Sequence, residues 1–255
     1  VLLVAQSGTF TMGTAASPIP RANPATLEFD SAADGDFGIV SWGSLEFAGE
    51  SRTSGKNIVQ CLLNTDEAAA QTVLGVDTDT GWKSGDKIAI GTTTRTRTQS
   101  EERVLASDAG ASSMTVTVGL TNAHSGTAPT QGEVVLLTRN VTLRAVTTSA
   151  TWYLHDRRAS ASAETYAASW TAFEYFGGGA GGPFQFRFQR ANSVTFAFCA
   201  FYQQERAVSV NTDGVAAVTM TLDDCIWFTN SAAIAGPLLT LTGYNLTVNR
   251  GVVIF

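Results

Sequence analysis

The sequence predicts an all-β protein whose C-terminal half forms a right-handed parallel β-helix, a solenoid in which each coil of the chain stacks on the coil before it. Two observations predict this fold. Apolar and polar residues alternate in short runs along the chain, as they do in strands with one buried face. In addition, one pattern recurs at a fixed spacing in the second half. The alternative is a β-sandwich, whose strands also recur at regular intervals.

Alternating runs bounded by Gly, Asp, Asn, Ser or Pro predict strands through the first half of the chain. Only residues 65–75, TDEAAAQTVLG, predict a short helix, because they are rich in alanine. The alternating apolar residues are Phe10 and Met12, Leu27 and Phe29, Leu45 and Phe47, Ile88 and Ile90, Met114 with Val116 and Val118, and Val141 and Leu143.

The repeat in the second half consists of four segments, each beginning 26 residues after the last: ASWTAFEYF (168–176), VTFAFCAFY (194–202), MTLDDCIWF (220–228) and LTVNRGVVI (246–254). Similar residues then fall into columns, as expected of coils stacked about 4.8 Å apart. The alternation breaks near Phe198 and Asp224, which predicts a corner there. The three columns are Trp170, Phe196, Leu222 and Val248; Phe173, Cys199, Cys225 and Gly251; and Tyr175, Phe201, Trp227 and Val253.

Composition excludes several functional classes. Of the 255 residues, 44% are hydrophobic and 15% are charged, which is typical of a folded chain. The formal net charge of −6 argues against nucleic acid, whose phosphates require clustered basic residues. No apolar run reaches the roughly 18 to 20 residues of a membrane-spanning helix. We therefore expect neither nucleic acid nor membrane insertion.

Six segments of the first half share an order and spacing with a known domain: GTFTMGT (8–14), WGSLEFAG (42–49), GWKSGDKIAIGTTT (81–94), SEERV (100–104), LTNAHSG (120–126) and EVVLLTRNVTL (133–143). Together they resemble the eight-glycine (G8) domain. That domain occurs in fibrocystin-like receptors, cell-surface hyaluronidases and bacterial surface proteins, where a parallel β-helix follows it. The resemblance implies a G8-like β domain over residues 1–145, incomplete at its N-terminus, and β-helix coils over residues 146–255.

Within the G8-like segments, the notable residues favour structural roles over catalytic ones. Trp82 before Ser84, Gly85 and Asp86 indicates a tight turn that leads into a strand, since glycine permits the required backbone angles. His124 stands alone in a polar turn, which favours a hydrogen-bonded or surface residue over a catalytic one. Three scattered cysteines lack the spacing of a zinc site, so we expect no metal and no cofactor. Cys199 and Cys225 share a column and point the same way, so we expect both to be reduced.

Hydrolysis of a polysaccharide requires two carboxyl groups about 5 to 10 Å apart across the sugar bond. The candidates near the repeats are Glu205, Asp223 and Asp224. Glu205 approaches a carboxylate of the neighbouring coil if the coils stack. The two aspartates lie where the alternation breaks, and aspartate is common at corners. A structural role for them is therefore favoured over a catalytic one.

The densest polar cluster follows two aromatic residues and has the chemistry to bind an acidic sugar. Arginine makes bidentate contacts to carboxylates, and an exposed aromatic ring offers a flat face to a sugar. A solvated loop that joins the first domain to the coils explains the same residues and is favoured over a binding site. The candidate ligand-binding residues are Trp152, Tyr153, His155, Asp156, Arg157 and Arg158.

Two functions follow. The first is an extracellular structural or adhesive β-helix module of a larger cell-surface or virion protein, with polysaccharide or another glycan as its partner. The alternative is a polysaccharide-degrading enzyme similar to the hyaluronidases. The first is favoured, because the clear signals are turns, strands and stacks. Since the end coils of a solenoid expose unpaired strand edges, we also expect neighbouring segments or subunits to cover both ends.

Overall fold

The computed structural model describes residues 1–30, 37–146, 152–156, 165–175, 186–188, 193–202, 208–211, 218–228, 239–242 and 244–254. The chain divides into two compact units. The first contains Val1–Glu50, Arg139–Cys225 and Ala233–Gly251, and the second contains Ser51–Thr138, Ile226–Ala232 and Val252–Phe255. No helix among the described residues is long and apolar enough to cross a membrane.

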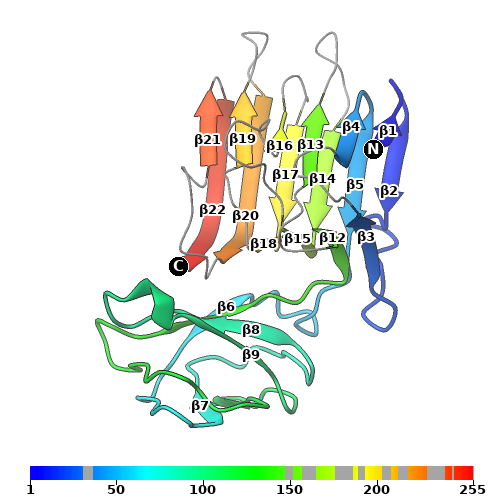
Figure 1. Cartoon of the computed structure of the whole chain (residues 1–255). Helices are drawn as coiled ribbons and strands as arrows, with labels where there is room; N and C mark the ends of the chain where they lie inside the picture. Colours follow the sequence, from blue (N-terminus) through cyan, green and yellow to red (C-terminus); the bar gives the residue numbers. More distant parts are fainter. Residues whose placement is uncertain are drawn as a thin grey trace. The chain divides into compact units, whose positions relative to one another are not determined.

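The first unit is a right-handed parallel β-helix with three faces, as the sequence predicts. The chain visits the faces in turn, and neighbouring strands on each face pair in parallel. A β-sandwich would require antiparallel strands here, so that alternative is wrong. One face, seen in Figure 1, is a six-stranded sheet of β1 (Leu2–Val4), β4 (Phe37–Ser41), β13 (Trp152–Asp156), β16 (Phe186–Arg187), β19 (Val208–Asn211) and β21 (Leu239–Thr242).

The other two faces belong to one ten-stranded sheet. They meet at β20 (Val218–Phe228), whose first half pairs with one face and whose second half continues into the other, and β22 (Tyr244–Ile254) pairs with β20. The second face contains β2 (Thr9–Met12), β5 (Ser44–Ala48), β14 (Thr165–Ser169) and β17 (Ser193–Ala197). The third contains β3 (Ala25–Phe29), β12 (Val141–Ala145), β15 (Thr171–Glu174) and β18 (Ala200–Tyr202).

The register confirms one step of the predicted repeat and corrects another. Phe196 pairs with Leu222, which is the predicted step of 26 residues. However, Phe196 pairs on its other side with Ala168, which is 28 residues earlier. The segment 168–176 was therefore aligned two residues out of register, and Phe173 stacks on Phe201 rather than on Cys199. At either spacing two of the three residues Trp170, Phe173 and Tyr175 meet an aromatic residue of the next segment, so the sequence pattern alone does not distinguish the two spacings.

The corner predicted near Phe198 and Asp224 is confirmed. Trp170, Phe198, Asp224 and Arg250 have φ angles of 48°, 54°, 48° and 57°, the left-handed region that residues other than glycine rarely occupy. Side-chain contacts along the corner offset this strain. The rings of Trp170 and Phe198 stack with centroids 4.9 Å apart, and Arg250 Nη2 lies 2.5 Å from Asp224 Oδ2.

The core of the β-helix is a column of stacked aromatic rings. Trp152 stacks on Phe29 with ring centroids 4.8 Å apart, and Phe173 stacks on Phe201 at 5.2 Å. Cys199 and Cys225 are buried free thiols, and burial raises the pKa of Cys199. Their Sγ atoms donate hydrogen bonds to backbone carbonyls of the adjacent coil, and the two thiols form no disulfide with each other. The fully buried aromatic side chains of this unit are Trp152, Phe173, Phe186, Phe188 and Phe201.

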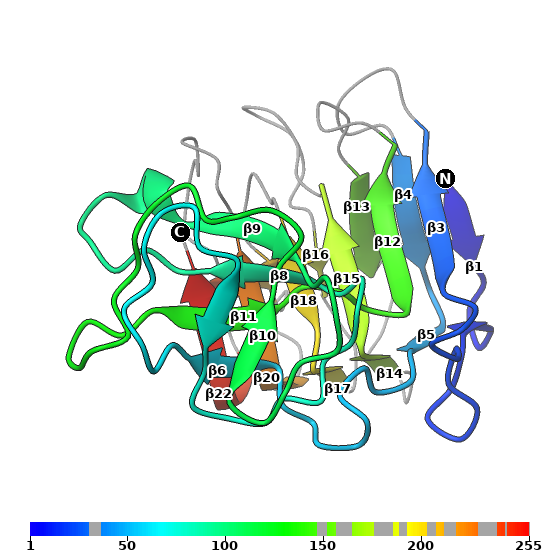
Figure 2. The ribbon, with the colours of Figure 1, turned by 90° about the horizontal axis from the view of Figure 1, so that it is seen from below.

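The second unit is an antiparallel β domain inserted into the second coil, between β5 and β12. In this coil the corner is replaced by residues 51–138, and the two ends of the insertion remain together, because Asn140 Nδ2 donates to Glu50 O at 2.8 Å. Figure 2 shows its strands, which form a four-stranded sheet and a two-stranded ribbon. They are β6 (Gln60–Leu62), β7 (Val73–Gly75), β8 (Lys87–Ile90), β9 (Glu101–Val104), β10 (Ser113–Thr115) and β11 (Glu133–Leu136), with a 3₁₀ turn, η1, at Arg97–Gln99.

This arrangement differs from the predicted boundary between residues 145 and 146. The strands β1 to β5 and β12 belong to the β-helix, and only the insertion is a separate unit. Strand alternation looks the same in both architectures, so the sequence does not reveal where one ends. The helix predicted at 65–75 is also wrong, since Glu67 forms an antiparallel bridge with His124 and Val73 begins β7. Strand pairing outweighs the helix propensity of so short a segment.

The predicted turn before β8 is confirmed. Trp82 is fully buried and its Nε1 donates to Ile58 O at 2.7 Å. Gly85 has a φ of 82°, and the buried Asp86 accepts from the Lys83 amide at 2.8 Å. Arg52 neutralises Asp86 through Nε at 3.0 Å.

Candidate functional site

The cluster predicted to bind a sugar is divided between the two sides of β13. Trp152 is fully buried in the core, and its Nε1 donates to Glu174 O at 2.9 Å, so the indole offers no face to a ligand. Tyr153 and His155 alternate with it and lie on the opposite side of the strand. Asp156 ends β13, and Arg157 and Arg158 lie outside the described residues.

Tyr153 and His155 form an aromatic pair on β13. Their ring centroids are 4.5 Å apart, with an angle of 31° between the planes. Tyr153 is half-buried and His155 is buried. The register places Arg187 of β16 directly beside His155, one coil further along. Sequence reasoning missed Arg187, because its alignment with β13 becomes visible only once the coils are in register.

The carboxylates considered for hydrolysis are placed at the corner or beyond the described residues. Asp224 is buried beside Arg250, and Asp223 is its half-buried neighbour on β20. Burial raises the pKa of Asp224, although the Arg250 guanidinium opposes this shift. Glu205 lies outside the described residues. Asp223 and Asp224 therefore belong to a different sheet from Tyr153 and His155, and the structure does not unite the two sets.

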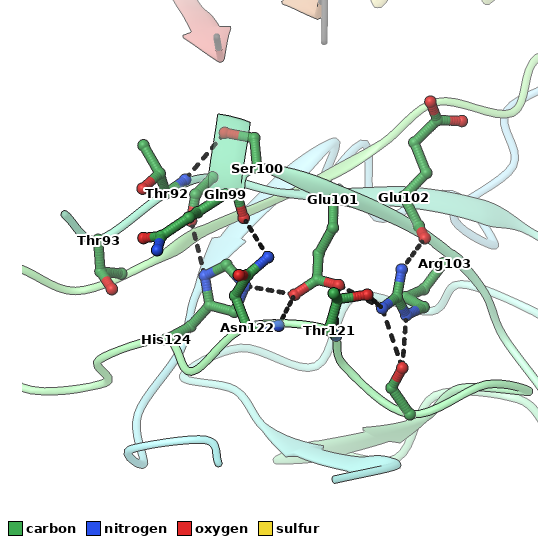
Figure 3. A network of polar contacts seen from close by, with 12 residues as sticks. Thr92, Thr93, Gln99, Ser100, Glu101, Glu102, Arg103, Thr121, Asn122 and His124 are labelled. Carbon is green, nitrogen blue, oxygen red and sulfur yellow. Dashed lines mark hydrogen bonds and ion pairs between the residues drawn. The ribbon is translucent and has the colours of Figure 1, made fainter. Parts of the chain in front are cut away.

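A polar network in the inserted unit centres on Glu101 (Figure 3). Its Oε1 accepts from His124 Nε2 at 2.7 Å and from the Asn122 amide at 3.1 Å. Its Oε2 accepts from the Thr121 amide at 2.7 Å and from Arg103. Burial opposes ionisation of this carboxyl, but the donated hydrogen bonds outweigh it and lower the pKa of Glu101.

His124 is a structural residue in this network, in agreement with the sequence. It is 2% exposed, and its Nδ1 lies 3.1 Å from Gly91 O. A carbonyl oxygen only accepts, so Nδ1 carries a proton, while Nε2 faces the Glu101 carboxylate. Neither ring nitrogen remains for a substrate. We call the contacts of His124 with Gly91 and Glu101 the His124 clamp, because they join the two ends of the loop between β8 and β9.

An open groove borders this clamp on the inserted unit, with a volume of about 800 Å³ that includes open solvent. Its residues come from three loops far apart in the sequence, so no sequence pattern united them. Among the described residues there is no cluster of three or more His, Cys, Asp or Glu side chains suited to a metal ion. The groove is lined by Asp66, Glu67, Ala68, Thr93, Thr94, Ala123, His124 and Ser125.

No protein-family model and no curated protein matches the chain, so no family match supports the expected G8 domain. Structural similarity is found to phage tailspikes. The chain resembles tailspike gp49 of Pseudomonas phage LKA1 (13% identity, TM-score 0.26), tailspike Gp54 of Acinetobacter baumannii bacteriophage AP22 in complex with A. baumannii capsular saccharide (12%, 0.29), and tailspike gp61 of Pseudomonas phage phi297 (10%, 0.29).

These similarities cover 89%, 89% and 88% of this chain but only 42%, 42% and 52% of the respective tailspikes. The chain thus spans about half the length of these structures or less. At such identities and TM-scores the likeness carries no argument of its own. The β-helix is established by the strand pairing described above.

Proposed function

We propose that the chain is a structural, glycan-binding β-helix module of a larger extracellular protein on a virion or cell surface. The observation that carries this proposal is the pairing of Tyr153 with His155 on β13, beside Arg187 of the next coil. The half-buried Tyr153 ring, on the side of β13 opposite the core residue Trp152, suits the apolar face of a sugar ring. A capsular saccharide accompanies one of the tailspikes above, and we propose the same class of partner here.

The polar side chains of the described residues favour binding over catalysis. Asp86 is engaged by Arg52, Glu101 by Arg103 and His124, and Asp224 by Arg250. Each of these carboxylates holds a turn or a corner in place. A binding module requires this rigidity, because a preformed surface loses less entropy when a ligand binds.

The alternative is a polysaccharide-degrading enzyme, and one observation favours it. Burial raises the pKa of Asp224, and a carboxyl with a raised pKa suits a general acid. Arg250 opposes that role, since it stabilises the ionised form. We therefore keep hydrolysis as the second candidate.

Binding to a glycan array tests the first proposal. Replacing Tyr153 with Ala should weaken the binding of the glycan by about 1 kcal/mol, or roughly fivefold in Kd, because the ring face is lost. Tyr153→Phe should retain most of the affinity. Phe10→Ala, which removes a half-buried ring from β2, is the matched control and should bind like the wild type. Equal affinity of Tyr153→Ala and wild type for every bound glycan would contradict the proposed site.

The same glycans should be tested for new reducing ends after incubation with the protein. A binding module releases none. Turnover that persists through purification and is lost in Glu205→Gln, Asp223→Asn or Asp224→Asn would establish the enzyme instead.

A further inference from the structure

The loop between β8 and β9 is basic in an otherwise acidic protein. Residues 91–100 read GTTTRTRTQS and contain two arginines and no acidic residue, whereas the whole chain has a net charge of −6. Such a loop is a local site of attraction for anionic groups.

Hydrogen bonds from its own side chains hold this loop in one conformation. The Thr92 amide donates to Ser100 Oγ at 3.0 Å, the Thr94 hydroxyl donates to Gln99 Oε1 at 2.5 Å, and the Thr96 amide donates to Thr94 Oγ1 at 3.1 Å. The His124 clamp fixes both ends of the loop (Figure 3). A side chain displayed from so ordered a backbone loses less entropy when it binds a ligand.

Arg95 is a basic residue of this loop whose side chain the structure describes. It is exposed and has no ion pair or hydrogen bond with any of the described residues. By contrast, Arg52 and Lys83 of the same unit each pair with an aspartate. Its guanidinium is therefore available for a bidentate contact with a carboxylate.

The groove begins at the residue before Arg95. Thr93 and Thr94 line it, together with Asp66, Ser125 and the small apolar Ala123. Asp66 accepts from the Gly126 amide at 2.8 Å and the Ser125 hydroxyl at 3.1 Å, and these bonds lower its pKa. The bonds from the Ser125 hydroxyl, the Gly126 amide and the Thr127 hydroxyl all end on Oδ1, so Oδ2 remains as an acceptor.

The groove also supplies a donor. Thr93 Oγ1 accepts from the Ser125 amide at 3.1 Å, which leaves the hydroxyl hydrogen of Thr93 available to a ligand. Glu67 borders the groove, is 1% exposed and carries a buried Oε2 atom without a hydrogen-bond partner. Together with Asp66 it makes the groove negative, so a simple anion is repelled from it. A ligand must bring hydroxyl groups to the groove and its anionic group to Arg95.

We propose that this groove and Arg95 bind a uronic-acid unit of a polysaccharide. The sugar hydroxyls donate to Asp66 Oδ2 and accept from Thr93, while the sugar carboxylate pairs with Arg95. A ligand pocket of a few hundred Å³ holds one or two sugar rings. This inference rests on the proposed function only in that the partner is a glycan, and it assigns a second site on the inserted unit, separate from Tyr153.

Titration of fluorescently labelled trigalacturonate into the full chain tests the site. Replacing Arg95 with Ala should weaken binding about tenfold or more, because a charge-assisted pair of hydrogen bonds to the sugar carboxylate is lost. The affinity of Arg95→Lys should fall between those of wild type and Arg95→Ala, since lysine keeps the charge but lacks the planar guanidinium that makes two hydrogen bonds. Lys83→Ala is the control, because it removes the same charge from the same unit at an ion-paired position and should leave the affinity within about twofold.

Two further ligands separate the contribution of the sugar hydroxyls from that of the negative charge. Methyl-esterified trigalacturonate, which keeps the hydroxyls and loses the charge, should bind wild type about as weakly as Arg95→Ala binds the acid. Inorganic phosphate should not compete. Equal affinity of Arg95→Ala and wild type, or competition by phosphate at comparable concentration, would overturn the proposal.

The Tyr153→Ala variant distinguishes the two proposals. Loss of uronate binding in Arg95→Ala but not in Tyr153→Ala supports the groove. If uronate binding is absent while another glycan binds in a Tyr153-dependent way, this inference falls and the proposed function stands. If uronate binds through Arg95 and no glycan depends on Tyr153, the groove stands and the β13 site falls.

Discussion

Glu101 organises the turn at residues 121–124 through three hydrogen bonds from that turn to its two oxygens, and Arg103 of β9 supplies a fourth. The sequence places this glutamate in the SEERV segment and His124 in NAHSG, but it does not show that the two meet. Their contact depends on the pairing of β8 with β9, which brings Gly91 and Glu101 to the same side of His124. A lone histidine and a glutamate thus form one structural unit.

Replacing Glu101 with Gln should lower the free energy of unfolding by about 1 to 3 kcal/mol, because a buried carboxylate that pairs with Arg103 and accepts from two backbone amides becomes a neutral amide with one acceptor oxygen. The pKa of Glu101 is lowered from its ordinary 4.5, so its contribution to stability is present above that value and is lost as the pH falls through the folded-state pKa. Urea unfolding between pH 7 and pH 3 should therefore show a shallower acid limb for Glu101→Gln. Glu102→Gln, whose carboxylate lies 3.9 Å from Lys87, is the control and should change stability by less than about 0.5 kcal/mol. Identical acid limbs for wild type and Glu101→Gln would contradict this account.

Among the elements, strands and corners were predictable and their register was not. Phe196 and Leu222 carry the alternation that places them in one column, and Asp224 interrupts it at a true corner. The step from Ala168 to Phe196 is two residues longer, and nothing local in the sequence records that difference. The candidate sites could not be predicted for the same reason, because the position of Arg187 and the lining of the groove depend on pairings between distant segments. Periodicity reports which side of a strand is buried, whereas register depends on the length of each connection.

Substitution of Phe173 tests how much the column of stacked aromatic rings stabilises the β-helix. It is fully buried and contacts Trp152, Phe186, Phe196 and Phe201. Phe173→Ala should therefore destabilise the chain by about 3 to 5 kcal/mol, through lost burial and a cavity that spans two coils. Phe173→Leu should recover much of this loss. Thermal unfolding with a far-UV signal measures both, and a Phe173→Ala variant as stable as Phe173→Leu would refute the stacking argument.

For the whole molecule, a β-helix and an inserted β domain explain the same alternation that suggested two consecutive domains. Gly49 lies close to Asn140 and to Trp170 of the next coil, and that coil passes from Ser169, paired with Ala48, to Thr171, paired with Val141, through the single corner residue Trp170. The insertion therefore occupies the place of one corner residue. At the ends of the solenoid, Leu3 and Val248 are 65% and 50% exposed. That neighbouring segments or subunits cover these ends stays a prediction.

Replacing residues 51–138 with a short glycine linker should leave a folded β-helix, because glycine adopts the positive φ that this corner requires. Circular dichroism should retain its strand signal, and heating should give one cooperative transition. A matched variant with the same linker replacing residues 194–202 removes strands from two faces and should fail to fold. If the shortened chain instead behaves like this disrupted variant, the insertion is needed for the integrity of the β-helix.

The position of the insertion has a kinetic consequence. Phe37 must find Trp152 across the whole inserted segment, whereas β13 meets β16 across a much shorter stretch of chain. If the insertion is unfolded, closing that longer loop costs about 1 kcal/mol more in entropy. Once the insertion folds, its two ends are adjacent and the loop becomes effectively short. We therefore expect the inserted unit to fold before β4 pairs with β13, so that the slowest step in forming the β-helix waits on a domain that contributes no strand to it.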